Sequence, residues 1–136
     1  MPDSRMIFVN LAVRDLGRSV EFFTKLGFSF NQQFTDETAT CMIISDKAFV
    51  MLLVHERFQD FTKKQIVDST QQTEVLVALS AESREAVDAM VHTALANGGS
   101  PAYDPQDHGF MYGSSFQDPD GHIWEVFWMD PAHVQG

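Results

Sequence analysis

The chain has 136 residues, of which 44% are apolar, and this is enough material for the core of one globular domain. Nineteen acidic residues against nine basic ones give a formal net charge of −10, which argues against nucleic acid and anionic membrane surfaces as partners. The single cysteine, Cys41, excludes an intramolecular disulfide. We find no apolar leader and no stretch of about 18 apolar residues, so we expect a soluble, cytoplasmic protein.

The first half of the chain has the pattern of a strand followed by a helix and three more strands. An apolar segment at residues 6–13 leads to Asp15, a good helix N-cap, and then to apolar residues at spacings of three and four. Gly27 predicts the helix end, because glycine adopts a left-handed conformation at little cost. The segments FSFNQQF, TATCMIIS and AFVMLLV then indicate strands.

The second half repeats this order. Residues 74–79 predict a strand, Ser80 or Ser83 a helix N-cap, and the pair Gly98 and Gly99 the end of the helix. Strand segments follow in PAYD, FMYGSSFQ and HIWEVFWM, the last two separated by the turn sequence DPDG. Both halves therefore predict the order β-α-β-β-β.

This repeat predicts one α+β domain over residues 1–136, with a first βαβββ module at 5–54, a polar connector at 55–72 and a second module at 73–130. Two copies of one topology indicate two sheets related by a pseudo-twofold axis, each with a helix on its outer side. Their inner faces would form a concave, open barrel-like cavity. The competing architecture is an α+β domain with an unrelated meander.

The last predicted strand carries a carboxylate, Glu125, between large apolar residues. Alternation places Ile123, Glu125 and Phe127 on one face and Trp124 and Trp128 on the other, where we expect both tryptophans to pack against a helix. Burial of an unpaired carboxylate is costly. Glu125 therefore either faces a cavity or has a hydrogen-bonding partner.

The segments VNLAVRDLGRSVEFFTKLGF and FQDPDGHIWEVFW, together with the paired modules, resemble the vicinal oxygen chelate superfamily. This group includes glyoxalase I, extradiol dioxygenases, fosfomycin-resistance proteins and bleomycin-binding proteins. The resemblance covers nearly the whole chain and implies the paired-module fold and a homodimer. It does not select one activity, because the fold hosts lyases, dioxygenases, transferases and metal-free binding proteins.

The resemblance also implies where metal ligands would lie, since the metal-dependent members take one ligand from the first and one from the last strand of each module. Glu125 matches the last strand of the second module, and Glu74 aligns with its first strand. In the first module the first-strand position is Phe8, and the last-strand ligand falls within the apolar residues 51–53. Two of the four positions thus retain a coordinating atom.

A catalytic Zn²⁺, Ni²⁺, Mn²⁺ or Fe²⁺ site normally needs about three protein ligands, so this set falls short and we expect no metal cofactor. If a metal does bind, its ligands would be Glu74, Glu125 and His55, with Asn10 as a further substitute. His55 follows the last strand of the first module, and its competing interpretation is a solvated residue of the connector.

Without a metal, the predicted cavity would hold a small organic molecule. The inner-face candidates for binding it are Phe8, Asn10, Glu74, Glu125 and Phe127. The loop DHGFMYGSSF would add His108 or Tyr112 at the cavity mouth, and the competing interpretations are a surface loop residue and an ordinary strand residue. Glu125 would contact the ligand or act as an acid/base catalyst; alternatively, backbone N–H groups or Asn10 satisfy it.

Three hypotheses for function follow. The first is a metal-independent small-molecule-binding protein of the glyoxalase/bleomycin resistance type. The second is a divalent-metal lyase or dioxygenase that uses Glu74 and Glu125, and the third is a non-catalytic interaction module whose cavity is filled by its own side chains. The acidic balance disfavours anionic ligands unless Lys63, Lys64 or Arg18 lies near the mouth.

Overall fold

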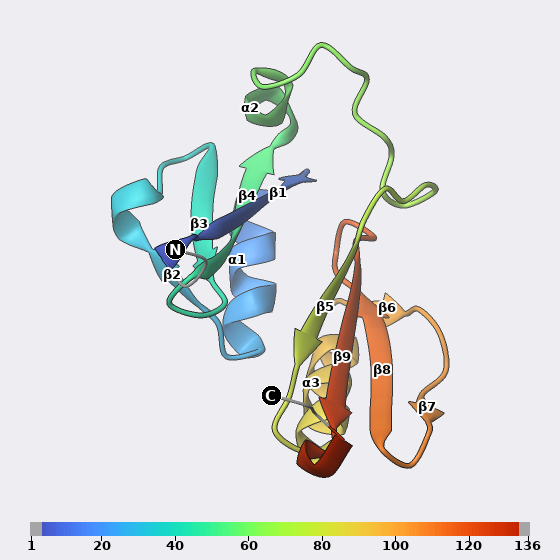
Figure 1. Cartoon of the computed structure of the whole chain (residues 1–136). Helices are drawn as coiled ribbons and strands as arrows, with labels where there is room; N and C mark the ends of the chain where they lie inside the picture. Colours follow the sequence, from blue (N-terminus) through green and yellow to red (C-terminus); the bar gives the residue numbers. More distant parts are fainter. Residues whose placement is uncertain (1–3, 134–136) are drawn as a thin grey trace. The chain divides into compact units, whose positions relative to one another are not determined.

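A computed structural model describes residues 4–133. The chain divides between Ile66 and Val67 into two compact units, each of mixed α+β composition with one sheet and one long helix (Figure 1). Residues 1–3 and 134–136 of the predicted domain lie outside the described part. Within residues 4–133, no helix is long and apolar enough to cross a membrane.

The sheet of the first unit has four strands in the order β1-β4-β3-β2. The strands are β1 (Ile7–Val13), β2 (Ser29–Asn31), β3 (Ala39–Ile43) and β4 (Ala48–Val54). β1 runs parallel to β4, whereas the other pairs are antiparallel. A short helix, α2 (His55–Gln59), follows β4 directly, and a 3-10 turn, Gln32–Phe34, follows β2.

Helix α1 (Leu16–Lys25) covers one face of this sheet (Figure 1). The side chain of Asp15 caps it by accepting a hydrogen bond from the backbone N–H of Arg18 at 3.1 Å, and Gly27 ends it with a φ of 101°. Phe22 and Phe23 of the helix are buried, as are Leu11 and Val13 of β1 and Leu52 of β4. The predicted cap and stop of this helix are therefore confirmed.

The second unit repeats the same plan with the strand order β5-β9-β8-β6. The strands are β5 (Leu76–Ser80), β6 (Ser100–Pro101), β7 (Gln106–Asp107), β8 (Met111–Gln117) and β9 (Ile123–Met129), and a 3-10 turn, Pro131–His133, follows. β5 is parallel to β9, and the two-residue strand β7, which the sequence did not predict, pairs with β8. The repeated βαβββ order is confirmed.

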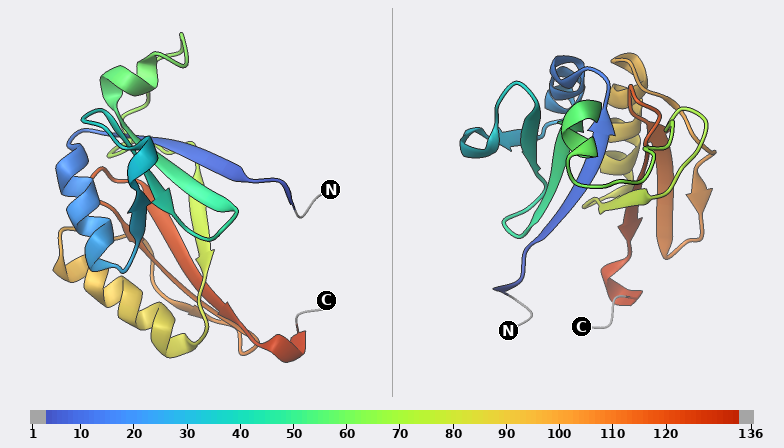
Figure 2. Two further views of the ribbon diagram at one scale, coloured as in Figure 1. Left: turned by 90° about the vertical axis from the view of Figure 1, so that its left-hand side faces the viewer. Right: turned by 90° about the horizontal axis from the view of Figure 1, so that it is seen from above.

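Helix α3 (Arg84–Ala96) lies along one face of this second sheet (Figure 2). Of the two predicted caps, Ser83 is the N-cap, accepting from the backbone N–H of Ala86 at 3.0 Å, while Ser80 ends β5. Trp124 is fully buried, and the Arg84 guanidinium of α3 lies 5.1 Å from the centroid of the Trp128 ring. Both tryptophans thus lie on the face opposite Glu125, as predicted.

The predicted connector at residues 55–72 is divided between the two units. α2 belongs to the first unit, and residues 67–72 belong to the second. In the second unit, the Ser69 hydroxyl donates to the carbonyl oxygen of Asp120 in the β8–β9 turn at 2.6 Å. The same turn is held by Asp118, whose buried carboxylate accepts a hydrogen bond from the indole N–H of Trp124 at 3.0 Å.

Some predicted strands are shorter in the structure. The segment FSFNQQF forms only the three residues of β2, because the Asn31 side chain accepts from the backbone N–H of Gln33 at 3.0 Å and starts a 3-10 turn. The segment PAYD contributes only Pro101 to β6, and β5 begins at Leu76. Glu74 therefore precedes the strand that was predicted to contain it.

Candidate functional site

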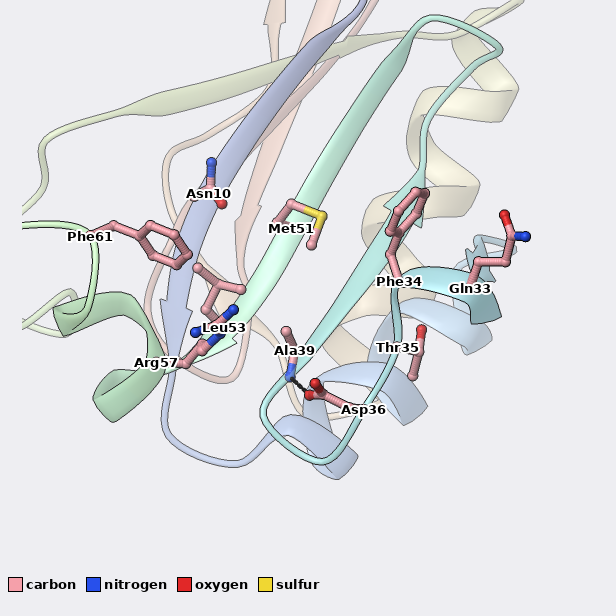
Figure 3. Close-up of a pocket in the computed structure, with 10 residues that line it drawn as sticks. All are labelled: Asn10, Gln33, Phe34, Thr35, Asp36, Ala39, Met51, Leu53, Arg57 and Phe61. Carbon is pink, nitrogen blue, oxygen red and sulfur yellow. Dashed lines mark hydrogen bonds between the residues drawn. The ribbon is translucent and has the colours of Figure 1, made fainter.

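The first unit contains a pocket of about 270 Å³ on the sheet face that points away from α1 (Figure 3). Its lining residues come from β1, β3 and β4 and from the segments that follow β2 and β4. They are Asn10, Gln33, Phe34, Thr35, Asp36, Ala39, Met51, Leu53, Arg57 and Phe61. All ten belong to the first unit.

The floor of the pocket is formed by neighbouring strands in register. Asn10 of β1 pairs with Met51 of β4, and Leu53 of β4 pairs with Ala39 of β3. Phe8 lies two residues before Asn10 on the same face, where its ring stacks on that of Phe49 with centroids 4.8 Å apart. Phe8 is thus a neighbour of the pocket rather than part of its lining.

Aromatic and charged side chains form the rim of the pocket. The side chains of Phe34 and Phe61 are 57% and 67% exposed, which is high for phenylalanine. The Arg57 guanidinium lies 5.1 Å from the centroid of the Phe61 ring, and one of its nitrogens lies 3.2 Å from an oxygen of Asp60. The rim therefore combines exposed apolar surface with a cation.

The carboxylate of Asp36 also lines the pocket, but it is engaged in its own loop. Its Oδ1 atom accepts hydrogen bonds from the backbone N–H and the hydroxyl of Thr38, both at 2.7 Å, and from the backbone N–H of Ala39 at 3.0 Å. These bonds, chiefly the one from the Thr38 hydroxyl, lower the pKa of Asp36, with a smaller contribution from the charge of Arg57. Asp36 therefore serves to hold the loop before β3.

Sequence reasoning did not identify Phe34, Arg57 or Phe61 as site residues. Phe34 ends the 3-10 turn that follows β2, Arg57 lies in α2 directly after β4, and Phe61 lies just beyond α2. The usable signal was this position, because residues just after strand ends often line sites on a sheet scaffold.

In the second unit, Glu125 has a hydrogen-bonding partner that the sequence did not reveal. The hydroxyl of Tyr103 donates to Oε2 of Glu125. The Ser115 hydroxyl, on the strand residue paired with Glu125, accepts from the backbone N–H of Tyr103 at 3.0 Å and donates to its carbonyl oxygen at 3.2 Å. Ser115 thus positions the loop residue that satisfies the carboxylate.

The environment of Tyr103 keeps its hydroxyl protonated. Burial raises the pKa of Tyr103 to about 12, and the hydrogen bond to Glu125 and the negative charge of that residue act in the same direction. At neutral pH the phenol is therefore a neutral donor. Tyr103 was hidden in the sequence because PAYD has the appearance of ordinary strand material, whereas only Pro101 of that segment belongs to β6.

The other residues predicted to bind a ligand in the second unit, Phe127, Tyr112 and His108, do not all lie on the sheet face of Glu125. Phe127 shares the sheet face of Glu125, since alternate residues of β9 point the same way. Tyr112 lies on the opposite face, paired with Trp128, and its hydroxyl donates to Asp88 of α3 at 2.6 Å. His108 is exposed in the loop before β8. The strand position of Tyr112 thus directs its side chain toward α3, and a role for His108 or Tyr112 at the mouth of a cavity stays a prediction.

The sheet registers also change the alignment of the two modules. Asn10 lies five residues before the N-cap Asp15 and pairs with Met51, and Ala78 lies five residues before the N-cap Ser83 and pairs with Glu125. Met51 is therefore the residue of the first module that corresponds to Glu125.

By the same count, Leu76 rather than Glu74 corresponds to Phe8. Phe8 lies two residues before Asn10, and Leu76 lies two residues before Ala78. Glu74 is exposed and precedes Leu76, the first residue of β5. His55 is the first residue of α2. Among residues 4–133, no three His, Cys, Asp or Glu side chains are grouped so that they could hold a metal ion.

The residues at the expected ligand positions do not fit a divalent metal. In the first unit these positions hold Phe8 and Met51, and a thioether suits soft ions such as Cu(I) rather than the metals of lyases and dioxygenases. In the second unit the first-strand position holds Leu76, which pairs with Ile123, and the carboxylate of Glu125 accepts a hydrogen bond from Tyr103.

With this geometry established, comparison with known proteins identifies the family. The sequence model of the Glyoxalase/Bleomycin resistance protein/Dioxygenase superfamily matches residues 5–126. The chain belongs to this superfamily. Among curated proteins, none matches.

Solved structures share the fold over nearly the whole chain. A hypothetical protein from S. aureus is 28% identical, with a TM-score of 0.77 over 90% of this chain and 92% of that one. A glyoxalase-related enzyme from Fulvimarina pelagi is 17% identical, with a TM-score of 0.78 over 91% and 87%. A glyoxalase/bleomycin resistance protein/dioxygenase family enzyme from Burkholderia phytofirmans is 19% identical, with a TM-score of 0.73 over 90% and 96%.

Proposed function

We propose that this protein binds a small aromatic or amphipathic organic molecule in the pocket of its first unit and does so without a metal. The observation that carries the proposal is the composition of the pocket, in which an apolar floor and exposed aromatic rings surround a few polar groups. Small-molecule sites usually have this composition, because apolar surface supplies affinity and a few polar groups fix orientation.

The exposed rings are the strongest support. Phe34 and Phe61 leave more than half of their surface accessible, although a phenylalanine gains about 1.5–3 kcal/mol when it is fully buried. A ligand seated between them and the floor at Met51 and Leu53 would bury part of that surface. The amides of Asn10 and Gln33 would give such a ligand hydrogen-bonding partners.

In the second unit we propose Glu125 as a residue that contacts a ligand or acts as an acid/base group. Its support is its position in the sheet. Among the paired residues of β5, β8 and β9, Glu125 is the only charged one. Tyr103 would then act as a neutral donor that orients the carboxylate. We also propose a cytoplasmic location, which the free, buried Cys41 supports. A homodimer is proposed from membership of the family.

The pocket is tested by a thermal-shift and NMR screen of small aromatic and amphipathic compounds against the whole chain. We expect hits whose affinity falls about tenfold in Phe34→Ala and in Phe61→Ala, which corresponds to about 1.4 kcal/mol of lost contact. Phe110→Ala is the matched control, because Phe110 is also exposed but lies in the second unit. Hits that the control weakens equally would contradict the pocket assignment.

The metal-independent part of the proposal is tested by elemental analysis. The purified chain is dialysed with Zn²⁺, Ni²⁺, Mn²⁺ or Fe²⁺, in parallel with Glu125→Gln. We expect substoichiometric metal in both proteins. Stoichiometric metal that disappears in Glu125→Gln would instead favour a metal-dependent lyase or dioxygenase.

A further inference from the structure

Arg57 places a cation in the pocket of the first unit. The chain as a whole carries a net charge of −10, which disfavours an anionic ligand unless a cation such as Lys63, Lys64 or Arg18 lies near the pocket. None of those three lines the pocket, whereas Arg57 does (Figure 3). The cation comes from α2, which starts directly after β4 and so carries Arg57 to the edge of the pocket floor.

The guanidinium of Arg57 retains free donors. A guanidinium has five N–H donors, and within residues 4–133 Arg57 makes one side-chain hydrogen bond, from Nη1 to Asp60 at 3.2 Å. Both members of this pair are open to water, with side-chain exposures of 44% and 62%. Exposed ion pairs contribute little, so Asp60 can share or release the guanidinium when another acid arrives.

One oxygen of the Asp36 carboxylate in the same pocket is engaged within its own loop. Its Oδ1 already accepts three hydrogen bonds from Thr38 and Ala39, which fix the loop before β3. Arg57 has no comparable structural duty. Arg57 is the one Lys or Arg among the lining residues of the pocket.

We propose that the pocket takes a small organic acid, with the carboxylate on Arg57 and an aromatic or branched apolar body between Phe34, Phe61 and Met51. A guanidinium binds a carboxylate through two parallel hydrogen bonds, which a neutral or cationic group cannot form. The volume of about 270 Å³ lies just below the range of pockets for drug-sized ligands, about 300–1,000 Å³, and suits a single ring with a short acidic side chain. This inference rests on the proposed function.

The test compares three probes that share a ring and differ in charge: phenylacetate, phenylacetamide and phenethylamine. Each is titrated into the isotope-labelled whole chain at neutral pH, and Kd is read from shifts of the backbone amides around the pocket and of the Arg57 side chain. We expect phenylacetate to bind at least about tenfold more tightly than the amide, and the amine to bind least.

Two variants connect this preference to Arg57. Arg57→Met should remove the advantage of the acid over the amide, and Arg57→Lys should restore only part of it, because lysine keeps the charge but loses the planar fork. Lys63→Met is the matched control, since it makes the same change in net charge outside the lining residues. It should leave the preference unchanged.

The outcomes separate this inference from the proposed function. Equal binding of all three probes, or tighter binding of the amine, would overturn the assignment of an acid and leave the pocket intact. Persistence of the acid preference in Arg57→Met would also overturn it. Failure of all three probes, together with failure of the wider compound screen, would overturn the proposed function itself.

Discussion

The hydroxyl of Tyr103 donates a hydrogen bond to the carboxylate of Glu125, which lies 22 residues further along the chain. This bond explains how a carboxylate is tolerated among the apolar residues of β9. A hydrogen bond to a charged acceptor offsets part of the cost of removing that acceptor from water. The Ser115 hydroxyl strengthens the arrangement by holding the backbone of Tyr103 in place.

Stability should fall at alkaline pH because of Tyr103. Its pKa is raised from 10.0 to about 12 in the folded chain, mainly by burial. Between these values the unfolded chain releases a proton that the folded chain keeps, so the free energy of unfolding decreases as pH rises from about 10 to about 12. Urea unfolding at a series of pH values measures this decrease.

The matching spectroscopic test follows phenolate absorbance. The chain has two tyrosines, and the hydrogen bond to Asp88 raises the pKa of Tyr112 as well. The native protein should therefore show less than half of its phenolate at pH 10, and Tyr103→Phe should remove the component that titrates last. A normal two-tyrosine titration in the native protein would argue against the Tyr103–Glu125 bond.

Phe34→Ala should weaken ligand binding without weakening the fold. Phe34 is 57% exposed, so its truncation should change the free energy of unfolding by less than about 1 kcal/mol. Phe23→Ala is the contrasting variant, because the Phe23 side chain of α1 is fully buried and its truncation should cost about 3–5 kcal/mol. Denaturant unfolding of both variants gives the comparison. Equal destabilisation would mean that Phe34 is a core residue.

Gly121→Ala should be much more harmful than Gly27→Ala, although both glycines have positive φ angles of 86° and 101°. A Cβ at Gly121 would lie 2.5 Å from the carbonyl oxygen of Ser69, whereas a Cβ at Gly27 would meet nothing within 4 Å. We expect about 1 kcal/mol for Gly27→Ala, from backbone strain alone, and about 3 kcal/mol or more for Gly121→Ala. Thermal and urea unfolding test the difference. Similar losses at the two sites would show that the contact between Ser69 and the turn does not persist in solution.

Cys41 should be unreactive in the folded protein. It is 1% exposed, and burial raises the pKa of its thiol, so both access and thiolate content are low. A thiol reagent at mildly alkaline pH should label the native chain slowly, at the rate of local opening. In denaturant it should label one equivalent at once. Rapid labelling of the native chain would contradict the burial of β3.

Local sequence was enough to predict much of the fold. Asp15 and Gly27 mark the ends of α1 through bonds to nearby residues, and the alternation in β9 gives the correct face to Glu125 and to Trp124. The repeat of β-α-β-β-β appears because each module buries its own apolar stripe. These features depend on residues close together in the chain, so their pattern is visible without tertiary contacts.

Contacts between distant residues determined the rest. Asn10 pairs with Met51, and Ala78 pairs with Glu125. When the two modules are aligned by these pairs, the expected ligand position falls on Leu76 and not on Glu74. Such a shift cannot be detected until the strands are paired. Tyr103, in a loop, and Arg57, in the connector, also depend on contacts between distant residues, so the sequence did not identify them as site residues. Loop residues meet a strand only where hydrogen bonds and side-chain packing between remote segments bring them, and for this reason the polar groups of the candidate site emerged only from the tertiary structure.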